Sequence, residues 1–165
     1  MKINEIIGDA KTIGIAGHIR PDGDCVGSCM ALYNYLAKNR EDLDVHVYLE
    51  SVDSKFSIIK NADCIDTNGY DGTVFDLFIS LDTASLDRLG QNLPFFTNAK
   101  RTACVDHHKS NSGYADYNYI LPDASSASEV LYDLLEDDII DKSVAEPLYM
   151  GIAHDSGVFR FQSTS

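Results

Sequence analysis

Apolar residues are distributed along this chain in two ways, as short uninterrupted runs and as stripes with helical spacing. The runs Thr12–Ala16, Val74–Leu81 and Arg101–Val105 are apolar enough to be buried parallel strands. Between Asp44 and Glu50, apolar and polar residues alternate, which is typical of a half-exposed strand at the edge of a sheet. The runs predict an α/β fold with an open, mainly parallel, Rossmann-like sheet.

The segments between these runs show helical periodicity. Apolar residues recur at helical spacing from about Cys25 to Lys38, which predicts an amphipathic helix packed on the sheet. The segment Ser128–Asp137 places four apolar residues on one face and predicts a second helix. Short helices are expected around 54–60 and 84–89. With helices between parallel strands, we expect both faces of the sheet to be covered.

The last apolar stripe runs from Val144 toward Asp155 and contains Pro147. A proline inside a helix removes one backbone hydrogen bond because it has no N–H. Two possibilities remain open at this point: a helix that begins nearer Glu146, or a longer helix that is kinked at Pro147.

Composition excludes several classes of protein. The length of 165 residues suits one domain with a sizeable core, and a net charge of −13 argues against binding to long nucleic acids, which requires a basic face. No run approaches the ~20 apolar residues of a membrane span. The first residues do not resemble a targeting signal, and the four cysteines form no Cys-x-x-Cys pair, so we expect buried, reduced thiols in a cytoplasmic protein.

Asp and His gather in four short clusters, and three of them follow a predicted strand. The clusters are His18–Asp24, Leu81–Thr83, Asp106–Asn111 and His154–Gly157. The carboxyl ends of neighbouring parallel strands meet at one edge of a sheet, so residues from distant clusters would face one crevice. Each cluster alone has an ordinary structural explanation, such as a turn or a helix cap. Their joint occurrence at successive strand ends favours a metal site.

Charge favours two ions over one at such a site. If Asp22, Asp24, Asp82 and Asp155 converge, their carboxylates repel one another by several kcal/mol at intermediate effective dielectric. Two divalent cations would bring them close to neutrality, together with neutral imidazoles. A set of carboxylate oxygens and imidazole nitrogens without thiolate suits Mn²⁺ or a similar ion.

The clusters resemble the motifs of the DHH family of phosphoesterases, named for the Asp-His-His that stands here as Asp106-His107-His108. The resemblance covers essentially the whole chain, because all four family motifs occur in order. The matching residues of the other three motifs are His18, Pro21, Asp22, Asp24, Gly27 and Ser28, then Asp82, then Asp155, Ser156, Gly157 and Phe159.

This resemblance implies roles for most of the Asp and His residues of the clusters. His18, Asp22 and Asp82 would hold one metal ion. Asp24, Asp82, His107 and Asp155 would hold the other, so that Asp82 bridges the two. His108 would face the substrate phosphate, and Asp106 would orient an imidazole. Further phosphate contacts would come from Arg20, Lys109, Asn111 and Arg160.

The function implied by the resemblance is hydrolysis of phosphate esters with two Mn²⁺ ions, or Mg²⁺ or Co²⁺. Gly23 and the run Gly27-Ser28 are more similar to the branch that acts on short oligoribonucleotides, linear or cyclic dinucleotides, or 3′-phosphoadenosine 5′-phosphate. The alternatives are an inorganic pyrophosphatase or exopolyphosphatase of the same superfamily, and a non-catalytic domain that binds metal or nucleotide. We expect a small nucleotide partner, no membrane partner and, through the strand at 44–50, a homodimer.

Relatives of this branch continue into a second, C-terminal domain of the DHHA1 type that closes over the substrate. No segment of residues 1–165 matches it, so we expect the chain to be the catalytic DHH domain of a longer protein. Low activity would follow, because that domain excludes water and positions the substrate.

Overall fold

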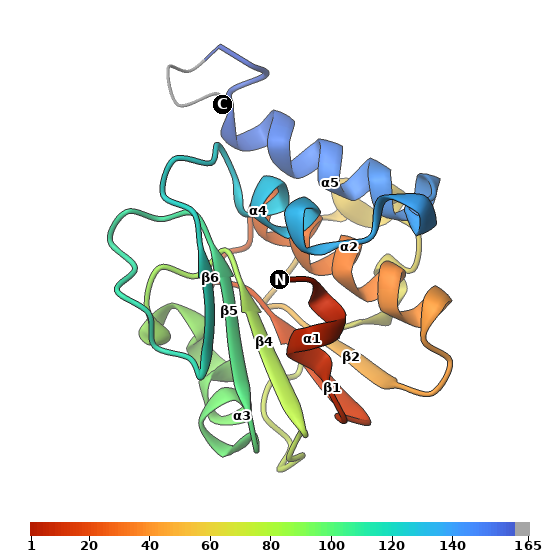
Figure 1. The fold of residues 1–165 in the computed structure, drawn as a ribbon. Helices are drawn as coiled ribbons and strands as arrows, with labels where there is room; N and C mark the ends of the chain where they lie inside the picture. Colours follow the sequence, from red (N-terminus) through yellow and green to blue (C-terminus); the bar gives the residue numbers. More distant parts are fainter. Residues whose placement is uncertain (161–165) are drawn as a thin grey trace.

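The computed structural model describes residues 1–160 as an α/β fold built on a six-stranded sheet (Figure 1). The strand order is β3-β2-β1-β4-β5-β6, and all five neighbouring pairs are parallel. This confirms the open parallel sheet. The strands are β1 (Thr12–Ala16), β2 (Asp44–Tyr48), β3 (Ile65–Asp66), β4 (Leu77–Leu81), β5 (Thr102–Asp106) and β6 (Tyr117–Ile120).

Alternate strand residues point to two different cores, so both faces of the sheet are covered. Ile13 and Ile79 face the larger core, which contains side chains of α1, α2, α4 and α5. Phe78 faces the smaller core, which is rich in aromatic rings and is covered by α3 and the 3₁₀ helix η3. Figure 1 shows α2, α4 and α5 stacked on one side and α3 on the other. The α-helices are α1 (Ile3–Ile7), α2 (Gly23–Asn39), α3 (Leu93–Asn98), α4 (Ala127–Leu134) and α5 (Lys142–Asp155), and the 3₁₀ helices are η1 (Ser54–Ile58), η2 (Ala62–Cys64), η3 (Leu86–Asn92) and η4 (Asp137–Ile139).

The strand order reverses between β1 and β4, and this reversal positions the site. From β1 the chain moves outward to β2 and β3, then returns to β4 and moves the other way to β5 and β6. The loops that follow β1 and β4 therefore leave the sheet in opposite directions. Such a reversal opens a crevice at the carboxyl ends of the two central strands.

Several predicted elements differ from the structure in their bounds or placement. The strand at 44–50 is not an edge strand, because β3 pairs with Val47 and Tyr48. The strand predicted from Val74 begins at Leu77, and the helix predicted over 128–137 ends at Leu134. The segment at 54–60 forms a 3₁₀ helix, and α1 and β6 were not predicted.

Helix α5 begins well before Glu146, so the shorter of the two predicted helices is wrong. Asp141 caps it by accepting a hydrogen bond from Ser143 N, and Pro147 lies inside it. Pro147 cannot donate to the carbonyl of Ser143, four residues earlier. The side-chain nitrogen Nδ2 of Asn34, in α2, donates to that carbonyl instead at 3.0 Å. A contact between two helices thus replaces the missing bond within one helix.

The thiols are free, and three of the four are buried as expected; Cys64 is exposed because it ends the short surface helix η2. Over residues 1–160, none of the helices has both the length and the apolar character needed to cross a bilayer.

Candidate metal centre

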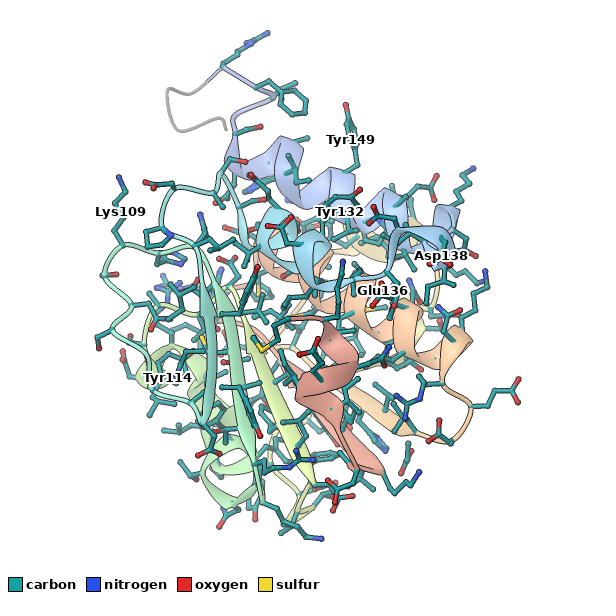
Figure 2. The ribbon with its side chains drawn as sticks, viewed as in Figure 1. Lys109, Tyr114, Tyr132, Glu136, Asp138 and Tyr149 are labelled. Carbon is teal, nitrogen blue, oxygen red and sulfur yellow. The ribbon has the colours of Figure 1, made fainter. Side chains whose placement is uncertain are left out.

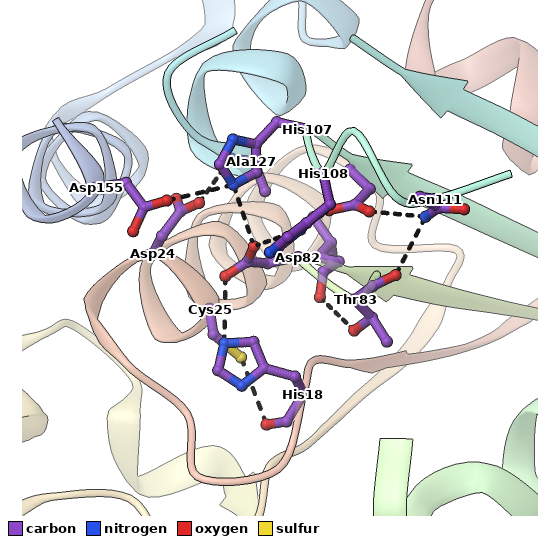
Figure 3. Close-up of polar contacts among 12 residues, drawn as sticks. His18, Asp24, Cys25, Asp82, Thr83, His107, His108, Asn111, Ala127 and Asp155 are labelled. Carbon is purple, nitrogen blue, oxygen red and sulfur yellow. Dashed lines mark hydrogen bonds and ion pairs between the residues drawn. The ribbon is translucent and has the colours of Figure 1, made fainter. Parts of the chain in front are cut away.

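The candidate site lies where β1, β4 and β5 end and where α2 begins (Figure 3). His18, Asp82 and His107 come from the loops after these three strands, as the topology requires. Asp22 and Asp24 lie at the N-terminus of α2, and Asp155 is the last residue of α5. Residues separated by more than a hundred positions therefore contribute to one cluster.

Asp82 is the centre of this cluster. Its side chain is only 3% exposed, and its Oδ2 lies 3.4 Å from Nε2 of His18. Its Oδ1 lies 3.6 Å from Nε2 of His107 and 3.7 Å from Nδ1 of His108. The backbone of Asp82 adopts a left-handed φ of 52°, which costs on the order of 1 kcal/mol or more outside glycine. The chain turns in this way just after β4, and the carboxylate lies between His18 and His107.

The backbone fixes the orientation of both imidazoles that face Asp82. Nδ1 of His18 lies 2.8 Å from the carbonyl oxygen of Ile19, and Nδ1 of His107 lies 3.3 Å from that of Ala124. In each ring Nδ1–H donates to the carbonyl, and Nε2 is directed at the carboxylates. A hydrogen bond of this kind orients a ligating histidine and selects its tautomer.

The two acidic residues at the start of α2 have different surroundings. Asp22 caps the helix by accepting hydrogen bonds from the backbone N–H groups of Asp24 and Cys25. Burial alone would raise the pKa of Asp22, but His18 and the Cys25 N–H hold it well below its usual range. Asp24 is fully buried, and burial together with the nearby charge of Asp82 raises its pKa to about 7.

Asp24 caps a different helix, α4. Its Oδ2 accepts a hydrogen bond of 2.6 Å from Ala127 N, and its Oδ1 accepts one of 3.0 Å from Ser128 N, both in the first turn of α4. A carboxylate is favoured there by the free N–H groups and the helix dipole. Gly151 of α5 makes room for this contact, because a Cβ at that position would lie 2.6 Å from Oδ1 of Asp24 and 2.0 Å from Oγ of Ser128.

The carboxylates of the cluster stabilise positive charge on the neighbouring imidazoles. Burial alone would lower the pKa of His18, but the carboxylates of Asp22 and Asp82 outweigh it and raise the pKa to about 11. Burial likewise lowers the pKa of His107, and the carboxylates of Asp155 and Asp82 raise it to about 11. Protons on these rings are needed to balance the carboxylates when no cation does so.

The donor atoms fit divalent metal ions. Among the described residues, buried Oδ1 of Asp82 and Nε2 of His107 have no hydrogen-bond partner, although carboxylate and imidazole groups surround them. Nε2 of His107 lies 3.2 Å from Oδ2 of Asp155, and Asp24, His107 and Asp155 each offer a ligand atom within 4.8 Å of the others. Such a mixed oxygen and nitrogen set suits Mn²⁺ and similar ions.

Two further side chains, Cys25 and His154, offer possible metal-ligand atoms near this cluster. Cys25 lies within the same range of His18 and Asp82, but burial raises the pKa of its thiol well above the usual value, so it stays protonated. His154 is exposed and forms a group with the half-buried Asp22 and Asp155, and its Nδ1 lies 3.5 Å from Oδ1 of Asp155. Sequence reasoning gave His154 no role, because the motifs do not include it.

His108 differs from the other two histidines. Its Nδ1 lies 2.7 Å from Oδ1 of Asp106, and its side chain is 40% exposed. It also offers a ligand atom within 4.8 Å of those of Asp82 and His107. Burial alone would raise the pKa of Asp106, but hydrogen bonds from His108 and Asn111 lower it. Both carboxylate oxygens of Asp106 thus have side-chain partners, His108 and Asn111.

The four predicted phosphate contacts lie in different environments. Arg20 and Lys109 are exposed on the loops after β1 and β5, and Figure 2 shows Lys109 extending outward from its loop. Arg160 is exposed beyond the end of α5. Asn111 is nearly buried, and its amide donates to Asp106.

Comparison with known proteins places these motifs in context. The family described as "DHH family, N-terminal domain" matches residues 12–152. The bifunctional oligoribonuclease and PAP phosphatase NrnA of Bacillus subtilis is 28% identical over 159 residues, covering 93% of this chain and 49% of the relative. A probable enzyme of the same name from Streptococcus mutans is 31% identical over 156 residues, covering 93% and 48%. The chain thus spans about half the length of the curated relatives it matches.

A solved structure supports the fold. An exopolyphosphatase-related protein from Bacteroides fragilis superposes with a TM-score of 0.84 at 22% identity, covering 99% of this chain and 51% of that one. At this identity the likeness shows that the arrangement of strands and helices is shared.

Proposed function

This chain belongs to the DHH family, and from that membership and the geometry around Asp82 we propose that it hydrolyses phosphate esters with the help of two divalent metal ions, Mn²⁺ foremost. The observation that carries the proposal is the position of Asp82, whose two oxygens face His18 and His107 from opposite sides. One carboxylate between two oriented imidazoles is what a bridging ligand requires.

Two ligand sets share this carboxylate. His18, Asp22 and Asp82 form the first, with Nε2 of His18 3.8 Å from Oδ1 of Asp22. The second adds Asp24, His107 and Asp155 to Asp82. When bound, such ions supply Lewis acidity that draws charge from phosphate oxygens and lowers the pKa of water.

The chain's own groups bind and orient the substrate. His108 can donate a hydrogen bond from Nε2 to a phosphate oxygen, since Asp106 engages its other nitrogen. Arg20, Lys109 and Arg160 are exposed cations that can contact the rest of an anionic substrate, which the net charge of −13 would otherwise repel.

As substrates we propose short oligoribonucleotides, linear or cyclic dinucleotides, and 3′-phosphoadenosine 5′-phosphate. The curated relatives, which are named as oligoribonucleases and PAP phosphatases, support the first and last of these. Inorganic pyrophosphate and polyphosphate are the alternative substrates. A non-catalytic role would leave metal binding without turnover.

The variant Asp82→Asn tests the proposal, because asparagine keeps the shape and tolerates the left-handed backbone but removes the shared charge. We expect wild-type protein to release nucleotide or phosphate from this substrate panel with Mn²⁺, and the variant to lose turnover and the paired-ion signal in electron paramagnetic resonance. The control is Asp87→Asn, at an exposed position of η3. Full activity in Asp82→Asn would rule out the bridging assignment.

A further inference from the structure

We propose that Asn111 is a positioning residue for His108 and acts on it through the carboxylate of Asp106. The proposal rests on the hydrolase function above and assigns Asn111 a different role from the phosphate contact expected from the sequence. Three side chains form a relay from the protein interior to the crevice: Asn111, then Asp106, then His108.

Each oxygen of Asp106 has its own partner in this relay. Oδ1 faces Nδ1 of His108 at 2.7 Å, and Oδ2 accepts a hydrogen bond of 2.7 Å from Nδ2 of Asn111. Asp106 is 0% exposed, so bulk water does not compete with either partner in the intact protein. Without the amide, Oδ2 would be a buried carboxylate oxygen lacking that donor, and the group would be free to turn toward another.

Asn111 is itself held from several sides. Its Nδ2 lies 3.2 Å from the carbonyl oxygen of Thr83 and 3.4 Å from Sγ of Cys104, and its Oδ1 accepts a hydrogen bond of 2.9 Å from Gly113 N. Figure 3 shows Asn111 and Thr83 together on the side of His108 away from Asp155. With only 9% of Asn111 exposed, its amide is committed to the protein and not to a ligand.

The imidazole of His108 needs such support because it is 40% exposed and lies on a loop. Asp106, in contrast, is the last residue of β5 and has a fixed backbone. A carboxylate locked on both oxygens can hold Nδ1 of His108 and keep Nε2 directed at the crevice. Groups that orient a metal-ligating histidine typically contribute about 10–100-fold in activity, and we expect an effect of similar size for the support of His108.

A purely structural role for Asn111 is the competing explanation, and Tyr114 supplies the matched control. The hydroxyl of Tyr114 donates to the same carbonyl of Thr83 at 2.8 Å and lies 3.0 Å from Oγ of Ser80. The variant Tyr114→Phe therefore removes part-buried hydrogen bonds from the same network without removing either side chain of the Asn111–Asp106 contact.

The first test is a double-mutant cycle on hydrolysis of a dinucleotide with Mn²⁺. We expect Asn111→Ala to lower kcat by about 10–100-fold with KM nearly unchanged. In a His108→Ala background the same change should lower kcat by less than about twofold, because its target is gone. Tyr114→Phe should stay near wild type. If Asn111→Ala lowers kcat by the same factor with and without His108, or if Tyr114→Phe lowers kcat as much as Asn111→Ala does, the proposal is overturned.

The second test does not depend on turnover, so it separates a failure of this proposal from a failure of the proposed function. In Mg²⁺-loaded wild-type protein, nuclear magnetic resonance should detect a protected Nδ1 proton on His108, assigned with His108→Ala. We expect this signal to be lost in Asn111→Ala and in the smaller change Asn111→Ser, and kept in Tyr114→Phe. An unchanged signal in folded Asn111 variants would refute the relay even if the wild-type protein hydrolyses no substrate of the panel.

Discussion

Replacing Gly151 with alanine tests how tightly α5 is packed against the candidate metal centre. An added Cβ would lie 2.0 Å from Oγ of Ser128, 2.9 Å from Cβ of Ser128 and 2.6 Å from Oδ1 of Asp24. The serine hydroxyl can rotate, but its Cβ cannot, and Asp24 is held by two backbone N–H groups of α4. Helix α5 must therefore move away from α4 and α2.

The magnitude follows from two opposing effects. Alanine is favoured over glycine inside a helix by about 0.8–1.0 kcal/mol, whereas overpacking a core costs about 1–3 kcal/mol. We expect overpacking to dominate here and to give a net loss of about 1–2 kcal/mol. For a chain of this size that lowers Tm by roughly 2–8 °C.

The shift should also reach the site. Asp155 lies one helical turn beyond Gly151 and 3.2 Å from Nε2 of His107. A displacement near 1 Å can cost about 100-fold in rate. Thermal denaturation and Mn²⁺ titration of Gly151→Ala measure both effects, and Ser128→Ala in the same background should recover part of the stability. A higher Tm in Gly151→Ala would refute the packing argument.

Two other predictions concern stability away from the metal ligands. Asn34→Leu should lower the free energy of unfolding by about 1–3 kcal/mol in urea denaturation, because it leaves the Ser143 carbonyl without its donor. Adding Pro147→Ala should recover part of this loss, since alanine restores a backbone N–H inside α5. No recovery would contradict the account of α5. Asp76→Asn should destabilise the protein at pH 7 but much less near pH 2. Hydrogen bonds from Lys100 and from the backbone at the start of β1 lower the pKa of Asp76, so its stabilisation is present above the pKa of the unfolded chain and is lost as pH falls through the folded value. A difference between the two proteins that does not vary with pH would argue against this.

The strands were predictable where burial alone decides their limits. β1 matches its prediction at both ends, because each of its residues continues the apolar run. The predicted start of β4 is three residues early, because Val74 and Phe75 are apolar and extend the run that predicts the strand. Asp76 receives hydrogen bonds from the backbone N–H groups of Lys11 and Thr12, and the regular strand begins only after it. A side chain that bonds a neighbouring backbone leaves no periodic signal.

The residues of the candidate site were predictable from the sequence, but the hydrogen bonds that hold them in place were not. Strand ends in a parallel sheet share one edge, and this explains why His18, Asp82 and His107 meet. Nothing near Asp24 in the sequence indicates that it caps a helix 103 positions away, nor that Asn111 faces inward. Such contacts depend on how α4 and the loop after β5 dock, which local patterns do not determine.

The cap that Asp24 places on α4 and the contact between Asp155 and His107 have a consequence for biosynthesis. His18, Asp22 and Asp24 leave the ribosome long before α5 is made. At about 5–20 residues per second, the nascent chain spends several seconds with these early acidic groups synthesised but their later partners missing. Capture of a cation by the complete ligand set would then have to wait until α5 has packed.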